Sequence, residues 1–227
     1  MEIKPIAYIH NSYKEKFGIP RQGALADEIE SSIVFEKEYR SADAVRGLEG
    51  FSHLWLIWEF SEIKDRAFRP TVRPPRLGGN KKVGVFASRS PYRPNSLGLS
   101  CVKIKEIDTE GENAPVIKIT GADLLCGTPI YDIKPYIPMS DCFPEAKEGY
   151  TAVTKEHFLS VIFSEKLKCG IDEETIKSVT QLISDDPRPG YSDDKDRIYY
   201  ICYGDYEFAF RVSGNEAEVC GVKNCKK

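Results

Sequence analysis

The chain has 227 residues, of which 41% are hydrophobic and 30% are charged, and its formal net charge is −3. This length and composition predict an ordinary soluble protein with one large domain, or one domain plus a small appendage. No run approaches the roughly eighteen apolar residues of a membrane-spanning helix, and the N-terminus lacks the apolar region of a signal peptide, so we expect a cytoplasmic protein that binds no membrane.

The first two thirds of the chain are rich in strand-like segments separated by Gly, Pro and Asn. These segments are residues 6–9, 32–39, 54–60, 83–87, 99–107, 116–120 and 130–133. Only residues 42–48, after a possible N-cap at Ser41, have a helical pattern. An antiparallel sheet of this size must hide its edges, so we predict a mainly β fold with a β-barrel or closed sheet over residues 1–145.

Basic residues are concentrated inside this β-rich part. Of the 32 basic and 35 acidic residues in the chain, 11 and 1 lie in residues 64–105, which leaves 21 and 34 elsewhere. Such a band attracts a polyanion to one part of the molecule while the acidic remainder repels it. The distribution favours a structured RNA or a small anion over general coating of DNA, although a solvated basic hairpin has the same composition.

Residues 84–100 lie within the basic band and read GVFASRSPYRPNSLGLS. Pro91 and Pro94 keep this stretch out of helix, so Arg89 and Arg93 are presented on a stiff loop. Guanidinium groups grip carboxylates and phosphates in fixed geometry. The loop is therefore a candidate site for an anionic or nucleotide-like ligand.

A second run, residues 121–138, reads GADLLCGTPIYDIKPYIP. Its Gly-Thr-Pro turn offers backbone groups that could read an adenine edge, while Asp123, Asp132 and Asp141 could orient donors or accept a proton. Asp and Gly are also the commonest turn residues, so the run alone fits an ordinary strand-turn-strand equally well. His53, ahead of a very apolar strand, is interpreted as a packed residue rather than a catalyst.

After about residue 141 the pattern changes to a small α+β unit, predicted over residues 146–227. One helix is expected over residues 155–167, and a second, capped by Asp172, carries an apolar stripe at residues 176, 179, 182 and 183. A hairpin follows over 198–203 and 207–212, with a frayed tail at 223–227. Seven scattered cysteines without a C-x-x-C pair and three dispersed histidines predict free thiols and no metal site, with a Cys/His nucleophile pair left open.

Several runs together resemble the TrmO (TsaA-like, YaeB-like) family. They are PRQ at residues 20–22, FSHLW at 51–55, TVRP at 71–74, RSPYRPN at 89–95, GTP at 127–129, DIKPY at 132–136 and DPRP at 186–189. The resemblance implies an S-adenosyl-L-methionine-dependent tRNA methyltransferase, a single-sheeted β-barrel that acts as a homodimer on the tRNA anticodon arm. Its implied reaction methylates N6 of N6-threonylcarbamoyladenosine at position 37.

The resemblance also implies residue roles. The cofactor site would comprise Pro20, Arg21, Gln22, Ser61, Glu62, Arg89, Leu99, Cys126, Gly127, Thr128 and Pro129. RNA contacts are expected at Arg69, Arg73, Arg76, Lys81, Lys82, Arg93, Lys134, Tyr136 and Arg188, with the threonyl carboxylate as the alternative partner of Arg93, Lys134 and Tyr136. Ser61, Glu62 and Cys126 depart from the residues usual in the family. Asp132 is the candidate proton acceptor by elimination.

Two alternatives remain open from the sequence. One is a non-catalytic RNA- or nucleotide-binding barrel, which would be favoured if the changed positions abolish cofactor binding. The other is a methyltransferase with a small-molecule acceptor, against which the segregated basic band argues.

Overall fold

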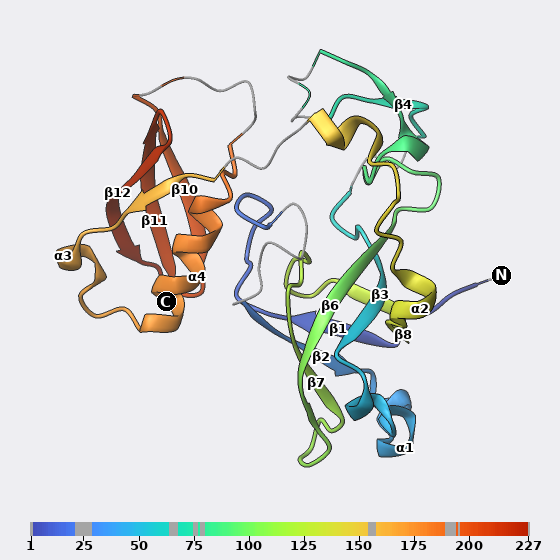
Figure 1. The fold of residues 1–227 in the computed structure, drawn as a ribbon. Coiled ribbons are helices and arrows are strands. Elements are labelled where there is room, and N and C mark those ends of the chain that lie inside the picture. The colour runs from blue at the N-terminus through green and yellow to red at the C-terminus, as the bar shows by residue number, and fades with distance from the viewer. Residues whose placement is uncertain are drawn as a thin grey trace.

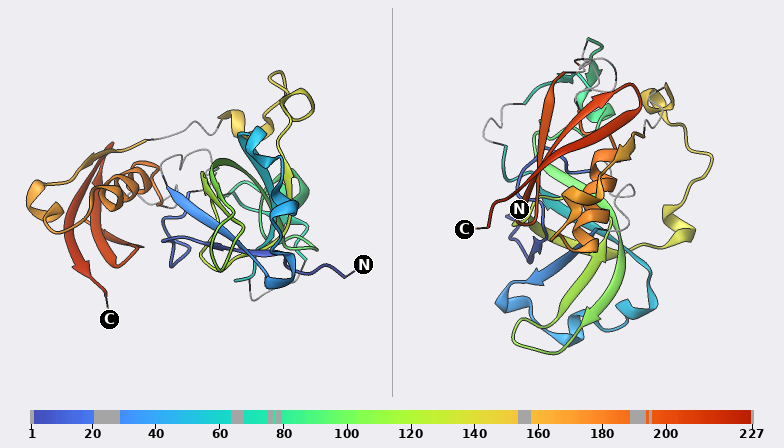
Figure 2. Two further views of the ribbon diagram at one scale, coloured as in Figure 1. Left: turned by 90° about the horizontal axis from the view of Figure 1, so that it is seen from below. Right: turned by 90° about the vertical axis from the view of Figure 1, so that its left-hand side faces the viewer.

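The structure is a computed structural model that describes residues 2–20, 29–63, 68–74, 77, 80–153, 158–188, 194 and 196–226. Its strands form a closed six-stranded barrel, a four-stranded sheet and a two-stranded ribbon. Figure 1 shows the barrel and the four-stranded sheet as two lobes, and Figure 2 shows the same lobes from two further sides. The predicted mainly β fold, with a closed barrel first and a small α+β unit after it, is confirmed.

The barrel contains the strands of the first two thirds of the chain, in the order β1-β2-β7-β6-β3-β8. All neighbouring pairs are antiparallel. The strands are β1 (Ala7–His10), β2 (Glu30–Phe35), β3 (His53–Glu59), β6 (Leu97–Asp108), β7 (Val116–Thr120) and β8 (Pro129–Pro135). Closure of the sheet pairs every strand on both sides, so the barrel has no free edge.

Alternation along β3 shows why this apolar strand is central. Leu54, Leu56 and Trp58 are buried inside the barrel, whereas the residues between them are only half-buried on its outer face. Successive side chains of a strand point to opposite faces, so one strand supplies both a core row and an outer row. Ile33, Ile117 and Ile119 fill the interior from β2 and β7.

Short elements connect the barrel strands, and two predicted strands are shorter than expected. The segment predicted as a strand over 83–87 has only β5 (Val83–Gly84), paired with β4 (Thr71–Val72), and then turns into η5 (Val85–Ala87). The strand predicted over 32–39 ends at Phe35. The other connecting elements are η2 (Lys37–Tyr39), α1 (Ala42–Val45), η3 (Leu48–Gly50), α2 (Pro138–Asp141) and η6 (Gly149–Val153).

The C-terminal lobe packs one helix against a four-stranded sheet of order β10-β11-β12-β9. Its elements are β9 (Ser160–Ile162), α3 (Glu165–Lys168), α4 (Glu173–Ser184), β10 (Ile198–Tyr203), β11 (Tyr206–Ser213) and β12 (Glu216–Asn224). The predicted second helix is α4, and its cap is confirmed because the Asp172 carboxylate accepts a hydrogen bond from the Thr175 N–H at 2.7 Å. The predicted hairpin is β10 and β11.

Two predictions in this lobe are wrong. The first three residues of the helix expected over 155–167 lie outside the described residues, and the rest is replaced by β9, which pairs parallel to β12, and by the four-residue α3. The frayed tail is also shorter than expected, since β12 continues to Asn224 and pairs Lys223 with Glu207 of β11. In both cases the pairing of distant strands outweighs a weak local pattern.

The core of the C-terminal lobe contains residues from the start of the chain. Tyr13 and Ile29 are buried in the same cluster as Phe208, Phe210 and Leu182. Tyr13 is 2% exposed, and its ring meets the ring of Tyr203 edge-on with centroids 6.0 Å apart. The chain therefore packs part of its N-terminal region into its second core, and the predicted boundary after residue 145 stays a prediction.

Candidate functional site at the rim of the barrel

The predicted cofactor segments gather at one rim of the barrel. Because neighbouring strands are antiparallel, β1, β3 and β7 end where β2, β6 and β8 begin, as the pairs Tyr8↔Pro129, Glu59↔Leu97 and Glu30↔Thr120 show. Segments 11–20, 61–62, 88–96 and 121–128 are the described connections at this rim. Arg21 and Gln22 were predicted to contact the cofactor and lie outside the described residues.

The Cys126-Gly127-Thr128 turn is hydrogen-bonded to β1. The Gly127 N–H donates to the Ile9 carbonyl at 2.8 Å, and the Ile9 N–H donates to the Thr128 carbonyl at 3.1 Å. Cys126 and Gly127 are exposed, Gly127 has a φ of 81°, and a Cβ added to it would meet nothing within 4 Å. The turn thus offers an open backbone surface on a fixed base.

Residues 11–13 hold the same turn from its other side. The Cys126 N–H donates to the Tyr13 carbonyl at 3.1 Å, and the Asn11 Nδ2 donates to the Leu124 carbonyl at 2.9 Å. Asn11 also accepts a hydrogen bond from the Tyr13 N–H at 3.1 Å. Changing Cys126 from the usual family residue leaves these main-chain contacts in place.

The Ser61-Glu62 turn lies beside two of the other rim segments. The Phe60 N–H donates to the Ser96 carbonyl at 2.8 Å, and the Lys16 ammonium donates to the Glu62 carbonyl at 2.9 Å. Both Ser61 and Glu62 are exposed. The structure therefore brings this turn, the loop that contains Arg89, and the segment leading to Pro20 together.

The loop over residues 85–93 is closed by its own side chains. Arg93 donates through Nη1 to the carbonyls of Ser88 at 2.6 Å and Val85 at 3.2 Å, and Ser88 Oγ donates to the Val85 carbonyl at 2.8 Å. Arg93 was predicted to contact RNA, and this nitrogen is instead committed to the loop. Arg89 is exposed and makes no hydrogen bond within the described part of the chain, so its guanidinium is available to a ligand.

A chain of buried polar groups reaches the rim from inside the barrel. The Trp58 Nε1–H donates to Ser100 Oγ at 2.9 Å, and Ser100 Oγ donates to Asp123 Oδ1 at 2.5 Å. Burial raises the pKa of Asp123 above its ordinary value, against the lowering effects of the Ser100 hydrogen bond and the Arg89 charge. Gly98 makes room for this arrangement, since a Cβ there would overlap the Trp58 indole.

Other predicted site residues lie on the outer face of the barrel. Leu99 and Asp132 flank Ile57 on neighbouring strands, and Leu99 is 54% exposed. Ser100 is 5% exposed and points inward, so Leu99 points to the opposite face. Asp132 forms an ion pair with Lys134 at 2.9 Å. The structure therefore separates Leu99 and Asp132 from the inward-facing Ser100 and Asp123.

The predicted RNA contacts differ in accessibility. Arg73, Lys81 and Lys82 are exposed around β4 and β5, and Arg76 lies outside the described residues. Arg188 is only 12% exposed and makes a two-pronged ion pair with Asp186, at 2.7 and 2.8 Å. A contact between Arg188 and phosphate stays a prediction, and two of the five guanidinium N–H groups are directed at Asp186.

Tyr136 also lies on the outer face, in an aromatic cluster. Its ring centroid is 5.7 Å from that of Trp55 and 6.1 Å from that of His53. The Trp55 indole N–H donates to the Asp141 carboxylate at 3.0 Å, and a bond from the Ile137 N–H, together with this one, lowers the pKa of Asp141. The cluster orders the connection after β8, and His53 is a packed residue in it.

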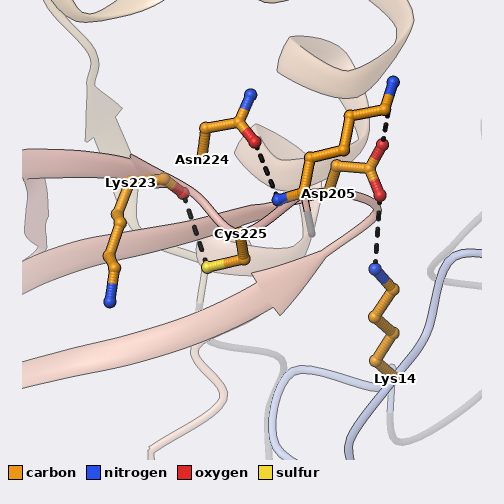
Figure 3. Close-up of polar contacts among 6 residues, drawn as sticks. Lys14, Asp205, Lys223, Asn224 and Cys225 are labelled. Atoms are coloured by element: carbon orange, nitrogen blue, oxygen red, sulfur yellow. Dashed lines mark hydrogen bonds and ion pairs between the residues drawn. The ribbon is translucent and has the colours of Figure 1, made fainter.

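The segment after β1 also covers the outer edge of β10 in the C-terminal sheet. The Gly204 N–H donates to the Ser12 carbonyl at 3.2 Å, and the Cys202 N–H donates to Glu15 Oε1 at 2.9 Å. Figure 3 shows Lys14 reaching Asp205 at the hairpin turn, at 3.4 Å. The rim turn and the C-terminal lobe are therefore held by one short stretch of chain.

No metal centre or membrane helix is found in the described parts of the chain. Among those residues, no group of three or more His, Cys, Asp or Glu side chains is placed to hold a metal ion. Within the same ranges, no helix combines the length and apolar character needed to cross a membrane.

The fold and the rim define a class of protein: a single-sheeted β-barrel with a loop-lined rim, joined to a small α+β lobe. Residues 8–142 match the family model described as the tRNA-methyltransferase O N-terminal domain, and residues 156–225 match the TrmO C-terminal domain. The chain therefore belongs to the TrmO family, as its motifs predicted.

Individual relatives cover nearly the whole chain. It is 36% identical over 230 residues to the tRNA (adenine(37)-N6)-methyltransferase of Escherichia coli (strain K12), covering 98% of this chain and 97% of the relative. It is 37% identical over 196 residues to a putative S-adenosylmethionine-dependent methyltransferase of Pseudomonas aeruginosa, covering 83% and 82%. A crystal structure of TrmO from Pseudomonas aeruginosa superposes with a TM-score of 0.77 at 28% identity, covering 99% of each chain.

Substitution of Tyr13 tests whether this residue joins the two lobes. Tyr13→Ala should lower the free energy of unfolding by about 3–5 kcal/mol, because it empties a large buried site. Tyr13→Phe should be neutral or stabilising, since the Tyr13 hydroxyl is buried with no hydrogen-bond partner among the described residues. Urea unfolding of both variants measures this, and a Phe variant as unstable as the Ala variant would contradict the assignment.

Proposed function

We propose that this chain is an S-adenosyl-L-methionine-dependent tRNA methyltransferase that methylates N6 of N6-threonylcarbamoyladenosine at position 37. The observation that carries the proposal is the convergence of the four described rim segments that the family motifs single out for the cofactor. Near full-length similarity to a protein named tRNA (adenine(37)-N6)-methyltransferase supports the base and its position. The threonylcarbamoyl group is part of the proposal because the motif resemblance implies it.

The rim residues fit the proposed cofactor. Gly127 leaves the space of a missing side chain over an exposed backbone, which suits the close approach of a planar base. Among the described residues, Arg89 supplies an available guanidinium for a carboxylate. When bound, S-adenosyl-L-methionine would supply an activated methyl group on a sulfonium.

The contribution of the protein to the reaction is mainly positioning. Holding reactants in line at about 3–3.5 Å replaces an encounter in solution with an ordered complex. The rim is suited to this because its turn is fixed by main-chain hydrogen bonds and its Arg93 loop is closed by its own side chains. A stiff site keeps the acceptor nitrogen aligned, because its loops do not have to become ordered during the reaction.

The surface around β4 and β5 is the proposed face for RNA. Phe86 is 70% exposed and Phe68 is 52% exposed, and the two rings stack with centroids 6.3 Å apart. Exposed Arg73, Lys81 and Lys82 belong to the same part of the chain. Unpaired bases of an RNA loop stack on aromatic rings, while cationic side chains contact the phosphates, so this combination fits an anticodon arm.

We also propose that the protein works as a homodimer. Leu99 is an expected cofactor contact, yet it points to the outer face of the barrel while Ser100 and Asp123 lie on the inner side. A second copy placed against the outer face would bring Leu99 to the rim of its neighbour. Sedimentation velocity at micromolar concentration should show a dimer that Leu99→Asp weakens, and a monomeric parent protein would contradict this proposal.

The activity is tested by methylation of tRNA that already carries the threonylcarbamoyl group, read by mass spectrometry of the digested nucleosides. The parent protein should add one methyl to that nucleoside. Arg89→Ala should reduce the rate by about 10²-fold or more, the usual cost of removing a charge-assisted contact that positions a reactant. Arg46→Ala is the matched control, since Arg46 is exposed at the end of α1 and pairs only with Asp43 in the described residues.

Failure of the parent protein to methylate several such tRNAs, despite measurable cofactor binding, would point to a different acceptor. Failure to bind the cofactor as well would favour a non-catalytic RNA-binding barrel. Isothermal titration with S-adenosyl-L-methionine distinguishes these two outcomes.

The RNA face is tested by the salt dependence of tRNA binding. A triple variant of Arg73, Lys81 and Lys82 to Gln should bind more weakly and should reduce the slope of log affinity against log salt by roughly 0.7–0.9 for each phosphate that is no longer neutralised. A control triple variant of Lys37, Arg46 and Lys147, which are exposed elsewhere, should leave the slope unchanged. An unchanged slope in the first variant would remove these residues from the interface.

A further inference from the structure

We propose that Asp123 accepts the proton that leaves the acceptor nitrogen during methyl transfer, and that Ser100 positions its carboxylate for this role. The inference rests on the proposed function and adds a residue to it, since the family motifs identify the turn after Asp123 but not Asp123 itself. Four observations support it: the position of Asp123, its hydrogen bonds, its electrostatic surroundings, and the exposure and ion pair of the competing Asp132.

Asp123 lies where the rim segments meet. It precedes the Cys126-Gly127 turn by three residues and lies three residues after the end of β7. Its hydrogen-bond partner, Ser100, belongs to β6, and the charge of Arg89 acts on it from the loop before β6. No other described carboxylate is tied both to the barrel interior and to the predicted cofactor segments.

The hydrogen bonds around Asp123 determine which groups donate to its carboxylate. The Trp58 indole can only donate, so its bond to Ser100 Oγ leaves the Ser100 proton free to point at Asp123 Oδ1. Oδ1 is thus occupied as an acceptor. The Asp123 backbone N–H also donates to this carboxylate, and no other side chain in the described ranges does, so the carboxylate keeps lone pairs that can receive a proton.

The surroundings make this carboxylate a better base than an ordinary aspartate. Burial raises its pKa, and a base with a raised pKa holds an accepted proton more firmly. Two titratable groups in the described part of the chain face it: Arg89, whose positive charge keeps the carboxylate ionisable, and Tyr13, whose own pKa burial raises so that it stays neutral. Burial therefore disfavours the ionised form of Asp123, and the Arg89 cation favours it.

The chemical step balances with this assignment. The lone pair of N6 forms the new bond to the methyl carbon, the electrons of the broken carbon–sulfur bond stay on sulfur, and the N6 proton passes to the Asp123 carboxylate. The nitrogen ends neutral, and the carboxylic acid later returns its proton to water. N6 is a weak nucleophile because its lone pair is shared with the purine and the carbamoyl group, so removing this proton lowers the barrier.

Asp132, the acceptor expected from the sequence, is less suited to this role. Its side chain is 45% exposed on the outer face and pairs with Lys134 at 2.9 Å. Its Oδ1 also accepts a hydrogen bond from the adjacent Ile133 N–H at 2.9 Å.

The test compares Asp123→Asn with the matched control Asp108→Asn, at the end of β6 away from the rim, in the same methylation reaction. Asp123→Asn should lower kcat by about 10²-fold or more, the usual contribution of a general base, while Asp108→Asn should stay within about threefold of the parent protein. Isothermal titration should give both variants an unchanged affinity for S-adenosyl-L-methionine. An active Asp123→Asn protein, or one that no longer binds the cofactor, would overturn the inference.

Two measurements on pH strengthen the test. A base must be deprotonated, so the rate of the parent protein should fall as the pH falls through the raised pKa of Asp123, above the roughly 3.9 of an ordinary aspartate. Carboxyl ¹³C NMR of the protein without cofactor should show the same raised pKa. Ser100→Ala removes the hydrogen bond that favours the charged form, so it should move both the NMR titration and the acid limb of the rate to higher pH.

An ordinary or lowered pKa of Asp123 in the NMR titration would overturn the inference whatever the activity. A parent protein that methylates no threonylcarbamoyl-containing tRNA would overturn the proposed function, and the assignment of Asp123 with it. A parent protein that is active beside an equally active Asp123→Asn variant would leave the proposed function standing and remove Asp123 alone.

Discussion

The hydrogen bonds between residues 9–13 and the turn after Asp123 are the interaction on which the rest of the site depends. They connect the end of β1 to the exposed backbone of Cys126 and Gly127 at 2.8–3.1 Å. The side chain of Tyr13 continues from the same segment into the core of the C-terminal lobe. A displacement of that lobe therefore acts on the main chain of the turn through a few covalent bonds, without any long-range network.

The polar chain of Trp58, Ser100 and Asp123 is the other constraint that shapes the rim. Placing a carboxylate near an apolar barrel core costs free energy unless its hydrogen bonds are satisfied. The barrel meets this cost with one serine, one indole and the nearby Arg89, and it uses Gly98 to leave space for the indole. Loops that only connect strands would need none of these residues. Their combination around Asp123 is consistent with the role proposed for its carboxylate.

Sequence patterns were sufficient for the barrel and for α4, because apolar strand-like runs such as β3 and the capped apolar stripe after Asp172 are local signals. They failed at β9 and β12, whose pairing joins residues more than fifty positions apart. The resemblance names Leu99 as a cofactor contact, and strand alternation turns its side chain to the outer face of the barrel. Asp123 was named as one of three acids, and it is distinguished from Asp132 and Asp141 by its burial and by its contact with Ser100 from a distant strand.

The covered edge of β10 has a consequence for how such a protein can change during evolution. The backbone of Cys202 and Gly204 finds its outer partners in residues 12–15, and the lobe takes Tyr13 into its core. Cut away from the barrel, the C-terminal lobe would present an unpaired strand edge beside an apolar hole, a combination prone to aggregation. The lobe is therefore not a portable module: recombination can exchange it only together with the short stretch of chain that follows β1.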